Sequence, residues 1–143
     1  MLARTFKTAA DLDITDKQYD ALIMTLEKME SGEMKKTNSF QGIKQTKKTE
    51  FSGLFNMAVW LGKSEHNCGT VGCIGGTSSL LAKDKNLWDG SKSIPQVDEL
   101  FFPSINNTNL MHITIAQATQ ALRNFLTIGT PNWEDVIDTS ENY

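Results

Sequence analysis

The stretch ITDKQYDALIMTLEKMESG, residues 14–32, carries the clearest structural signal in this chain. Its apolar side chains recur every three or four residues, while the charged side chains fall mostly between them. The apolar positions are Tyr19, Leu22, Ile23, Leu26 and Met29. This spacing is typical of an amphipathic helix that buries one face against a protein core.

Both ends of this helix are marked in the sequence. Thr15 is a good N-cap residue, and Gln18 three positions later completes a capping box, in which each side chain bonds the backbone N–H of the other residue. Gly32 suits the left-handed conformation that commonly follows a helix C-terminus. The sequence therefore predicts a helix over residues 16–31.

A second helix with the same start signal is predicted in ITIAQATQALRNFLTIGTP, residues 113–131. Thr114 and Gln117 form another capping box, and Gly129 with Pro131 ends the helical pattern. The expected buried face carries Ile115, Ala118, Leu122 and Phe125. The two capping boxes do not extend into a longer internal repeat.

The other apolar segments are shorter. SIPQVDELFFP, residues 93–103, predicts a short helix closed by Pro103, and SGLFNMAVWLGK, residues 52–63, predicts a buried turn of helix. Strand signals are nearly absent. We therefore expect an all-α fold, a small helical bundle with a glycine-rich central helix and a lysine-rich loop, as a single domain over residues 1–143.

The composition fits one globular domain, with 143 residues, 39% hydrophobic and 22% charged. A net charge of −3 argues against a general nucleic-acid or membrane-surface binder. The first residues lack the apolar core of a signal peptide, and no run approaches the length of a membrane span. We expect a cytoplasmic protein whose two cysteines are free thiols.

Residues 34–49 contain five lysines and no acid, among many Thr, Ser, Gln and Gly residues. This composition is typical of a solvated segment, so we expect a flexible basic loop over residues 34–50. The alternative is a basic patch that recruits a phosphate-bearing ligand or an acidic partner. Lys44, Lys47 and Lys48 are the candidate binding residues of that patch.

The stretch HNCGTVGCIGG, residues 66–76, holds both cysteines and one of the two histidines. A helix is predicted over residues 71–83 with Thr70 as its cap, although each internal glycine costs about 1 kcal/mol relative to alanine. Close packing of another segment on Gly72 and Gly76 would offset that cost. A ligand at the helix start is the alternative, because free N–H groups there attract anions.

Two kinds of chemistry are conceivable in this stretch. His66, Cys68, Cys73 and His112 are suitable zinc ligands, but the spacing H-x-C-x4-C matches no common zinc pattern. Cys68 at a helix start could be a nucleophile with His66 or His112 as its base, yet neither histidine has an obvious orienting acid beside it. The simpler interpretation is two small buried thiols in a crowded joint.

Aromatic residues cluster before the glycine-rich stretch. Phe51, Phe55 and Trp60, together with Met57, are expected to form the core against which the glycine-rich helix packs. The alternative makes Trp60, Trp88 or Trp133 a stacking wall for a nucleobase. Trp133 follows the helix of residues 113–131, where an aromatic side chain commonly folds back to close the core.

Several of these motifs occur together in a known group of proteins. FNMAVW, CGTVGCIGG, IT at a helix start, FLTIG and PNW resemble, in this order, a group of small uncharacterised proteins common in bacteriophages and their hosts. The resemblance spans residues 22–133. It implies a phage-type accessory protein in a bacterial cytoplasm, with no established reaction, and small phage proteins of this sort often act by binding.

The sequence thus favours a non-enzymatic binding protein without a cofactor. It would occupy a host protein, or sequester a small anionic, nucleotide-like ligand, in counter-defence; a homo-oligomer is left open. The expected contact residues are Cys68, Gly69, Thr70, Gly72, Gly76, Lys44, Lys47, Lys48 and Trp60. The alternative is a small hydrolase, dependent on Cys and His or on zinc, centred on HNCGTVGC.

Overall fold

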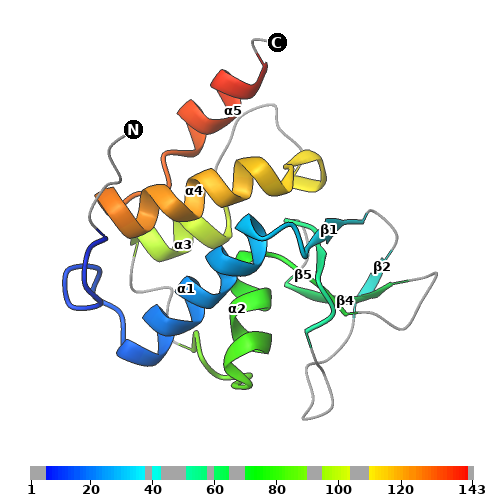
Figure 1. Ribbon diagram of the computed structural model, residues 1–143, viewed down its shortest axis with the longest axis horizontal. Coiled ribbons are helices and arrows are strands. Elements are labelled where there is room, and N and C mark those ends of the chain that lie inside the picture. Colours follow the sequence, from blue (N-terminus) through cyan, green and yellow to red (C-terminus); the bar gives the residue numbers. More distant parts are fainter. Residues whose placement is uncertain are drawn as a thin grey trace.

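A computed structural model gives the arrangement of the chain. Its described residues are 6–37, 40–42, 51–57, 60–64, 70–89, 95–103 and 110–141. Within them the protein is mainly helical, with helices gathered on one side and a small sheet on the other (Figure 1). None of the described helices is long and apolar enough to cross a membrane.

The helices follow the sequence signals closely where those signals are local. The first, α1, spans Asp16–Glu30, and α4 spans Ile115–Ile128. Both begin with the predicted capping boxes, and Gly32 and Gly129 have the positive φ angles of 81° and 86° that suit left-handed caps. The short helix α3, Pro95–Phe101, begins at a proline. Proline fits the first helical position because a backbone N–H there has no partner within the helix.

Two further helices complete the helical layer. The glycine-rich segment contributes α2, Ile74–Ala82, and the C-terminal segment contributes α5, Trp133–Glu141. The sequence prediction missed α5, although Glu134 and Asp135 in its first turn are a helix-start signal. The expectation that Trp133 closes the core is confirmed, because this side chain is only 2% exposed.

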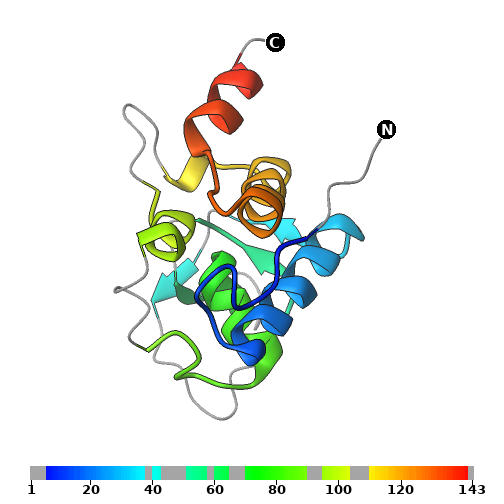
Figure 2. The ribbon, with the colours of Figure 1, turned by 90° about the vertical axis from the view of Figure 1, so that its left-hand side faces the viewer.

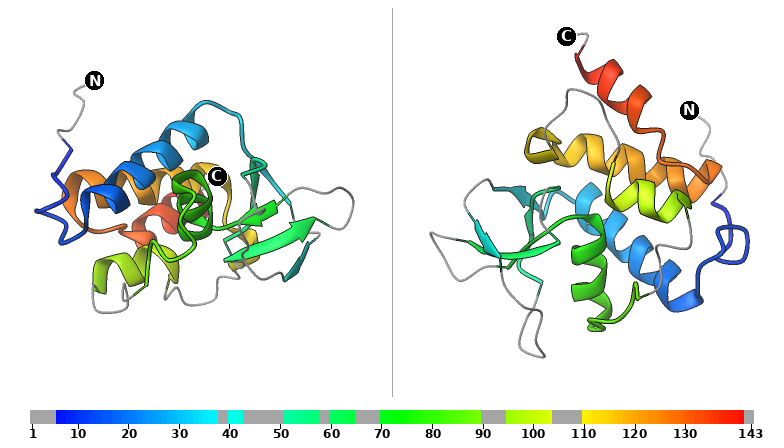
Figure 3. Two further views of the ribbon diagram at one scale, coloured as in Figure 1. Left: turned by 90° about the horizontal axis from the view of Figure 1, so that it is seen from below. Right: turned by 180° about the vertical axis from the view of Figure 1, so that it is seen from behind.

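The prediction of packed helices is confirmed, but the fold is not all-α, because the chain also forms a small sheet. It has five short strands in the order β1-β3-β5-β4-β2, with β1, β3 and β5 parallel and β4 antiparallel to both β5 and β2. The strands are β1 Lys35–Lys36, β2 Phe40–Gly42, β3 Leu54–Phe55, β4 Leu61–Ser64 and β5 Thr70–Gly72. Figure 3 shows the sheet at one end of the helical layer, and in Figure 2 the sheet lies behind the helices.

Two specific predictions fail because of this sheet. The segment of residues 52–63 supplies β3 and β4 instead of a turn of helix, since a short apolar run fits a strand as well as a helix. Part of the expected basic loop, residues 34–50, is also ordered by pairing, as Lys35 and Lys36 pair with β3 and Phe40–Gly42 pairs with β4. Backbone partners distant in sequence decide both outcomes.

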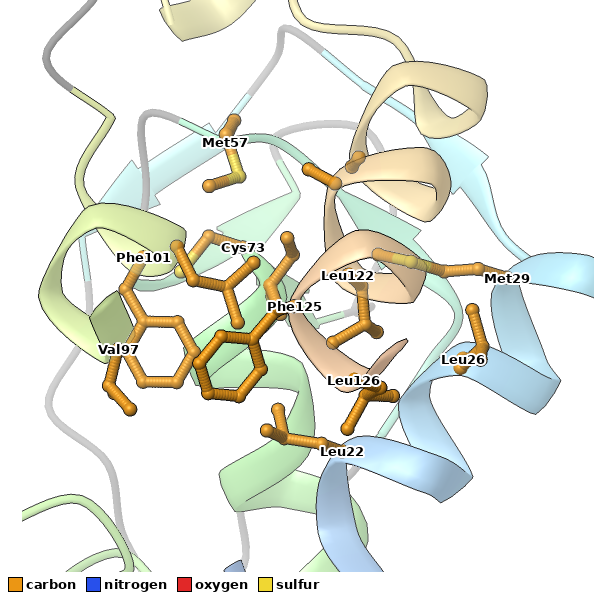
Figure 4. Close-up of a cluster of buried hydrophobic side chains, with 14 of the residues drawn as sticks. Leu22, Leu26, Met29, Met57, Cys73, Val97, Phe101, Leu122, Phe125 and Leu126 are labelled. Atoms are coloured by element: carbon orange, nitrogen blue, oxygen red, sulfur yellow. The ribbon is translucent and has the colours of Figure 1, made fainter. Parts of the chain in front are cut away.

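The core lies between the helices. Leu122, Phe125 and Leu126 of α4 are almost fully buried, between apolar side chains of α1 on one side and of α3 on the other (Figure 4). α1 also packs against α2, and α4 contacts α5 (Figure 1). Phe55 and Met57 are buried as predicted, so the sheet joins the same core.

We predict that Thr114→Ala lowers the free energy of unfolding by about 1 kcal/mol, because the Thr114 Oγ1 that accepts from the Gln117 N–H at 3.1 Å is lost. Thr114→Ser keeps this acceptor and should stay within a few tenths of a kcal/mol of the original protein. Urea unfolding measures both variants, and equal losses in the two would show that the cap contributes little.

Candidate functional site

The candidate site is the junction where β5 passes directly into α2. β5 ends at Gly72, Cys73 keeps an extended backbone with φ −81° and ψ −169°, and α2 begins at Ile74. The Cys73 Sγ accepts the N–H of Gly76 at 3.5 Å, so Cys73 is the N-cap. Sulfur is a weak acceptor, but a small apolar cap suits a position that is only 1% exposed.

The predicted cap at Thr70 is therefore wrong. Thr70 lies in β5, three residues before the actual N-cap, and its neighbours in the sheet are β3 and β4. Pairing on both sides of β5 engages backbone groups that a helix over residues 71–73 would need for itself. The helix consequently begins three residues later than predicted.

The glycines of this junction give room to Trp60. A Cβ atom built on Gly75 would lie 2.3 Å from Cζ3 and 2.5 Å from Cη2 of the Trp60 ring. A Cβ atom on Gly72 would lie 3.2 Å from the Trp60 carbonyl oxygen and 3.2 Å from the Thr77 nitrogen. Trp60 thus contacts the junction on both sides of Cys73, with its backbone at Gly72 and its ring at Gly75.

This geometry corrects the predicted packing surface. Gly72 belongs to a strand and Gly76 to α2, so the two glycines do not form the expected packing surface of one helix. A close approach to glycine is present, but it occurs at Gly72 and Gly75. The approaching residue is Trp60, which directly precedes β4. Gly76 is buried and serves the cap through its N–H.

Trp60 belongs to an aromatic cluster that connects the sheet to α3. Its ring meets Phe101 edge-on, with centroids 5.6 Å apart, and stacks on Phe102 at 5.9 Å with an angle of 20° between the planes. Phe101 in turn meets Trp88 edge-on at 4.7 Å. Such pairs contribute beyond their buried area, so the cluster fixes α3 against the β5–α2 junction.

The three tryptophans have different roles in the structure. Trp88 is buried and its Nε1 donates to the Ser78 Oγ at 2.8 Å, while the Trp133 Nε1 donates to the Glu99 carbonyl oxygen at 2.9 Å. Both are core residues with satisfied N–H groups. Trp60 is half-buried, and of the three it alone reaches the surface.

Phe102 is a surface residue that sequence reasoning overlooked. It is 48% exposed, although its neighbour Phe101 is 1% exposed. One face of its ring is covered by Trp60, and its N–H continues the α3 hydrogen-bond pattern to the Asp98 carbonyl oxygen at 2.8 Å. The four-residue spacing from Asp98 was a sequence signal for a shared helix face.

The thiol of Cys73 is poorly suited to chemistry. Burial raises its pKa to about 11, and the N–H groups of Gly76 and Gly75 only partly offset that effect. The group is therefore a neutral thiol at physiological pH, whereas the thiolate is the nucleophile and metal ligand. Cys73 is a free thiol within the core, beside Phe101 in the view of Figure 4.

Several predicted site residues lie outside the described part of the chain. They are Lys44, Lys47, Lys48, His66, Cys68 and Gly69, and the Thr70 side chain is likewise not described. His112 is exposed, in a short 3-10 helix over Leu110–His112, whereas Cys73 is buried. Among the described residues no three His, Cys, Asp or Glu side chains gather in a group that could hold a metal ion.

No family model, curated protein or solved structure matches this chain. The contacts of the junction and of the neighbouring surface therefore carry the functional argument.

We predict that Gly75→Ala lowers the free energy of unfolding by roughly 1–3 kcal/mol, because the new methyl group displaces the Trp60 ring. In a Trp60→Ala background the same substitution should cost much less, because only the 3.1 Å approach to the Phe101 Cδ2 atom remains. A double-mutant cycle by urea unfolding measures this coupling. Additive effects would contradict the contact.

We also predict that Cys73 resists thiol reagents. In a Cys68→Ser variant, where Cys73 is the single thiol, dithionitrobenzoate should label almost none of the native protein at pH 8 and one equivalent after unfolding in urea. Trp60→Ala in the same background should speed up labelling, because Trp60 contacts the glycines on either side. Fast labelling of the native single-thiol protein would show an open junction.

Proposed function

We propose that this protein is a non-enzymatic, phage-type accessory protein that binds a partner protein in the bacterial cytoplasm, in counter-defence. The observation that carries the proposal is the aromatic pair of Trp60 and Phe102. Phe102 presents nearly half of its surface to solvent, and Trp60 behind it is fixed by the closely approached Gly75. Exposed aromatic side chains on a rigid support are typical anchors of protein interfaces.

The alternative of a sequestered anionic ligand finds little support at α2. An anion needs free N–H groups at an open helix start. Here Cys73, Ile74, Gly75 and Gly76 are all buried, and the Gly76 N–H already donates to the Cys73 Sγ. That alternative now depends on Lys44, Lys47 and Lys48, which lie outside the described residues.

The hydrolase alternative is weakened in a similar way. Cys73 is a buried neutral thiol that caps a helix, and His112 is on the surface. A catalytic or zinc centre would have to rest chiefly on His66 and Cys68, outside the described residues. The described contacts favour partner binding over chemistry at this junction.

Site-specific photo-cross-linking in bacterial cells tests the proposal. Benzoylphenylalanine at position 102 keeps an aromatic side chain there and should cross-link to one defined host protein. The control position is Met24, which is 37% exposed on α1 and should give no such product. Equal products from both positions, or none from either, would contradict a partner-binding surface at Phe102.

A further inference from the structure

The helix α3 has one buried face and one exposed face. Val97, Leu100 and Phe101 point into the core with at most 1% exposure. Asp98 and Phe102 are both exposed, and the hydrogen bond from the Phe102 N–H to the Asp98 carbonyl oxygen places them one helical turn apart. An acidic residue and a partly exposed aromatic residue are therefore neighbours on the surface, one helical turn apart.

Among the described residues, an aromatic ring and a carboxylate are joined by a cation at two other places. Arg123 lies over the Phe6 ring, 5.6 Å from its centroid, and its Nε donates to the Glu30 Oε2 at 3.0 Å. Lys28 lies 5.9 Å from the centroid of Phe51, and its Nζ is 2.9 Å from the Glu33 Oε2. Both are exposed or half-buried triads of ring, cation and carboxylate.

Asp98 and Phe102 form the third pair of ring and carboxylate, but without a cation. Within the described part of the chain, Asp98 makes no ion pair, and no Lys or Arg lies over the Phe102 ring. Trp60 stacks on that ring from one side, and the exposed part of the ring is open to a ligand. The pair is complementary to a positively charged group that is flat or slender enough to stack on a ring.

We infer that Asp98 and Phe102 bind a basic side chain of the partner protein, with arginine fitting better than lysine. The guanidinium group stacks on the ring face while its N–H groups bind the carboxylate, as Arg123 does between Phe6 and Glu30. A nucleic acid is disfavoured, because its phosphates would meet the Asp98 carboxylate on a protein of net charge −3. This inference rests on the proposed function and names the chemistry of the partner.

The experiment uses a defined probe and the full-length, isotopically labelled protein. Acetyl-Gly-Arg-Gly-amide is titrated while backbone amide and Trp indole NMR signals are followed, and the same peptide with citrulline is the neutral control. We expect shifts centred on Asp98, Phe102 and the Trp60 indole, with at least fivefold weaker binding of the citrulline peptide. Binding should also weaken as salt is added.

Matched variants locate the contact. Asp98→Asn and Phe102→Leu should each weaken binding of the arginine peptide at least threefold, while Phe102→Tyr keeps the ring and the affinity. Ile128→Ala removes another exposed large apolar side chain, 37% exposed on α4, and should change nothing. Retained amide signal dispersion in each variant shows that the fold is intact.

Other outcomes would overturn the inference. Equal binding of the arginine and citrulline peptides would mean a simple apolar contact, and stronger shifts at Phe102 with adenosine monophosphate would indicate a nucleobase platform. One such outcome is a cross-link from position 102 to a host protein that the Asp98→Asn variant binds with unchanged affinity. In that case the proposed function stands and this inference fails. If the peptide binds as expected but no cross-link forms, the proposed function fails instead.

Discussion

The structure depends on one close contact, between the ring of Trp60 and the α-carbon of Gly75. A larger residue fits there only if the ring moves, because a Cβ atom would lie 2.3 Å from the ring. The contact places the start of β4 against the first turn of α2, and the same ring reaches Phe101 and Phe102 at the end of α3. Sheet and helices are thereby joined at one point. The burial of Cys73 and the exposure of Phe102 follow from this contact.

This joint also decides which chemistry the glycine-rich stretch can support. With Trp60 on Gly75 and its carbonyl oxygen beside Gly72, the intervening Cys73 is enclosed and its thiol stays neutral. A cysteine that looks reactive in the sequence is used as a buried helix cap. What the joint leaves accessible is the exposed part of Phe102, with Asp98 one turn away.

The surface follows a repeated pattern of ring, cation and carboxylate. Arg123 and Lys28 each bridge an aromatic ring and an acid across elements of this chain, so the pattern serves as internal attachment. On α3 the ring and the acid occur together without a cation from the described residues. Contacts that hold a chain together and contacts that bind a partner can thus use the same physical chemistry.

The sequence alone determined the features that depend on neighbours within one helical turn. The capping boxes at Thr15 and Thr114, and the left-handed glycines that follow α1 and α4, lie where the sequence predicts them, because each needs only residues three or four positions away. Only the tertiary structure decided that residues 70–72 form the central strand of a sheet, since their partners are Leu54–Phe55 and Leu61–Lys63. It also decided that Cys73 is the cap of α2 and that Phe102 stays exposed while Phe101 is buried. Those outcomes depend on side chains that are distant in sequence, above all on Trp60, and local patterns do not contain them.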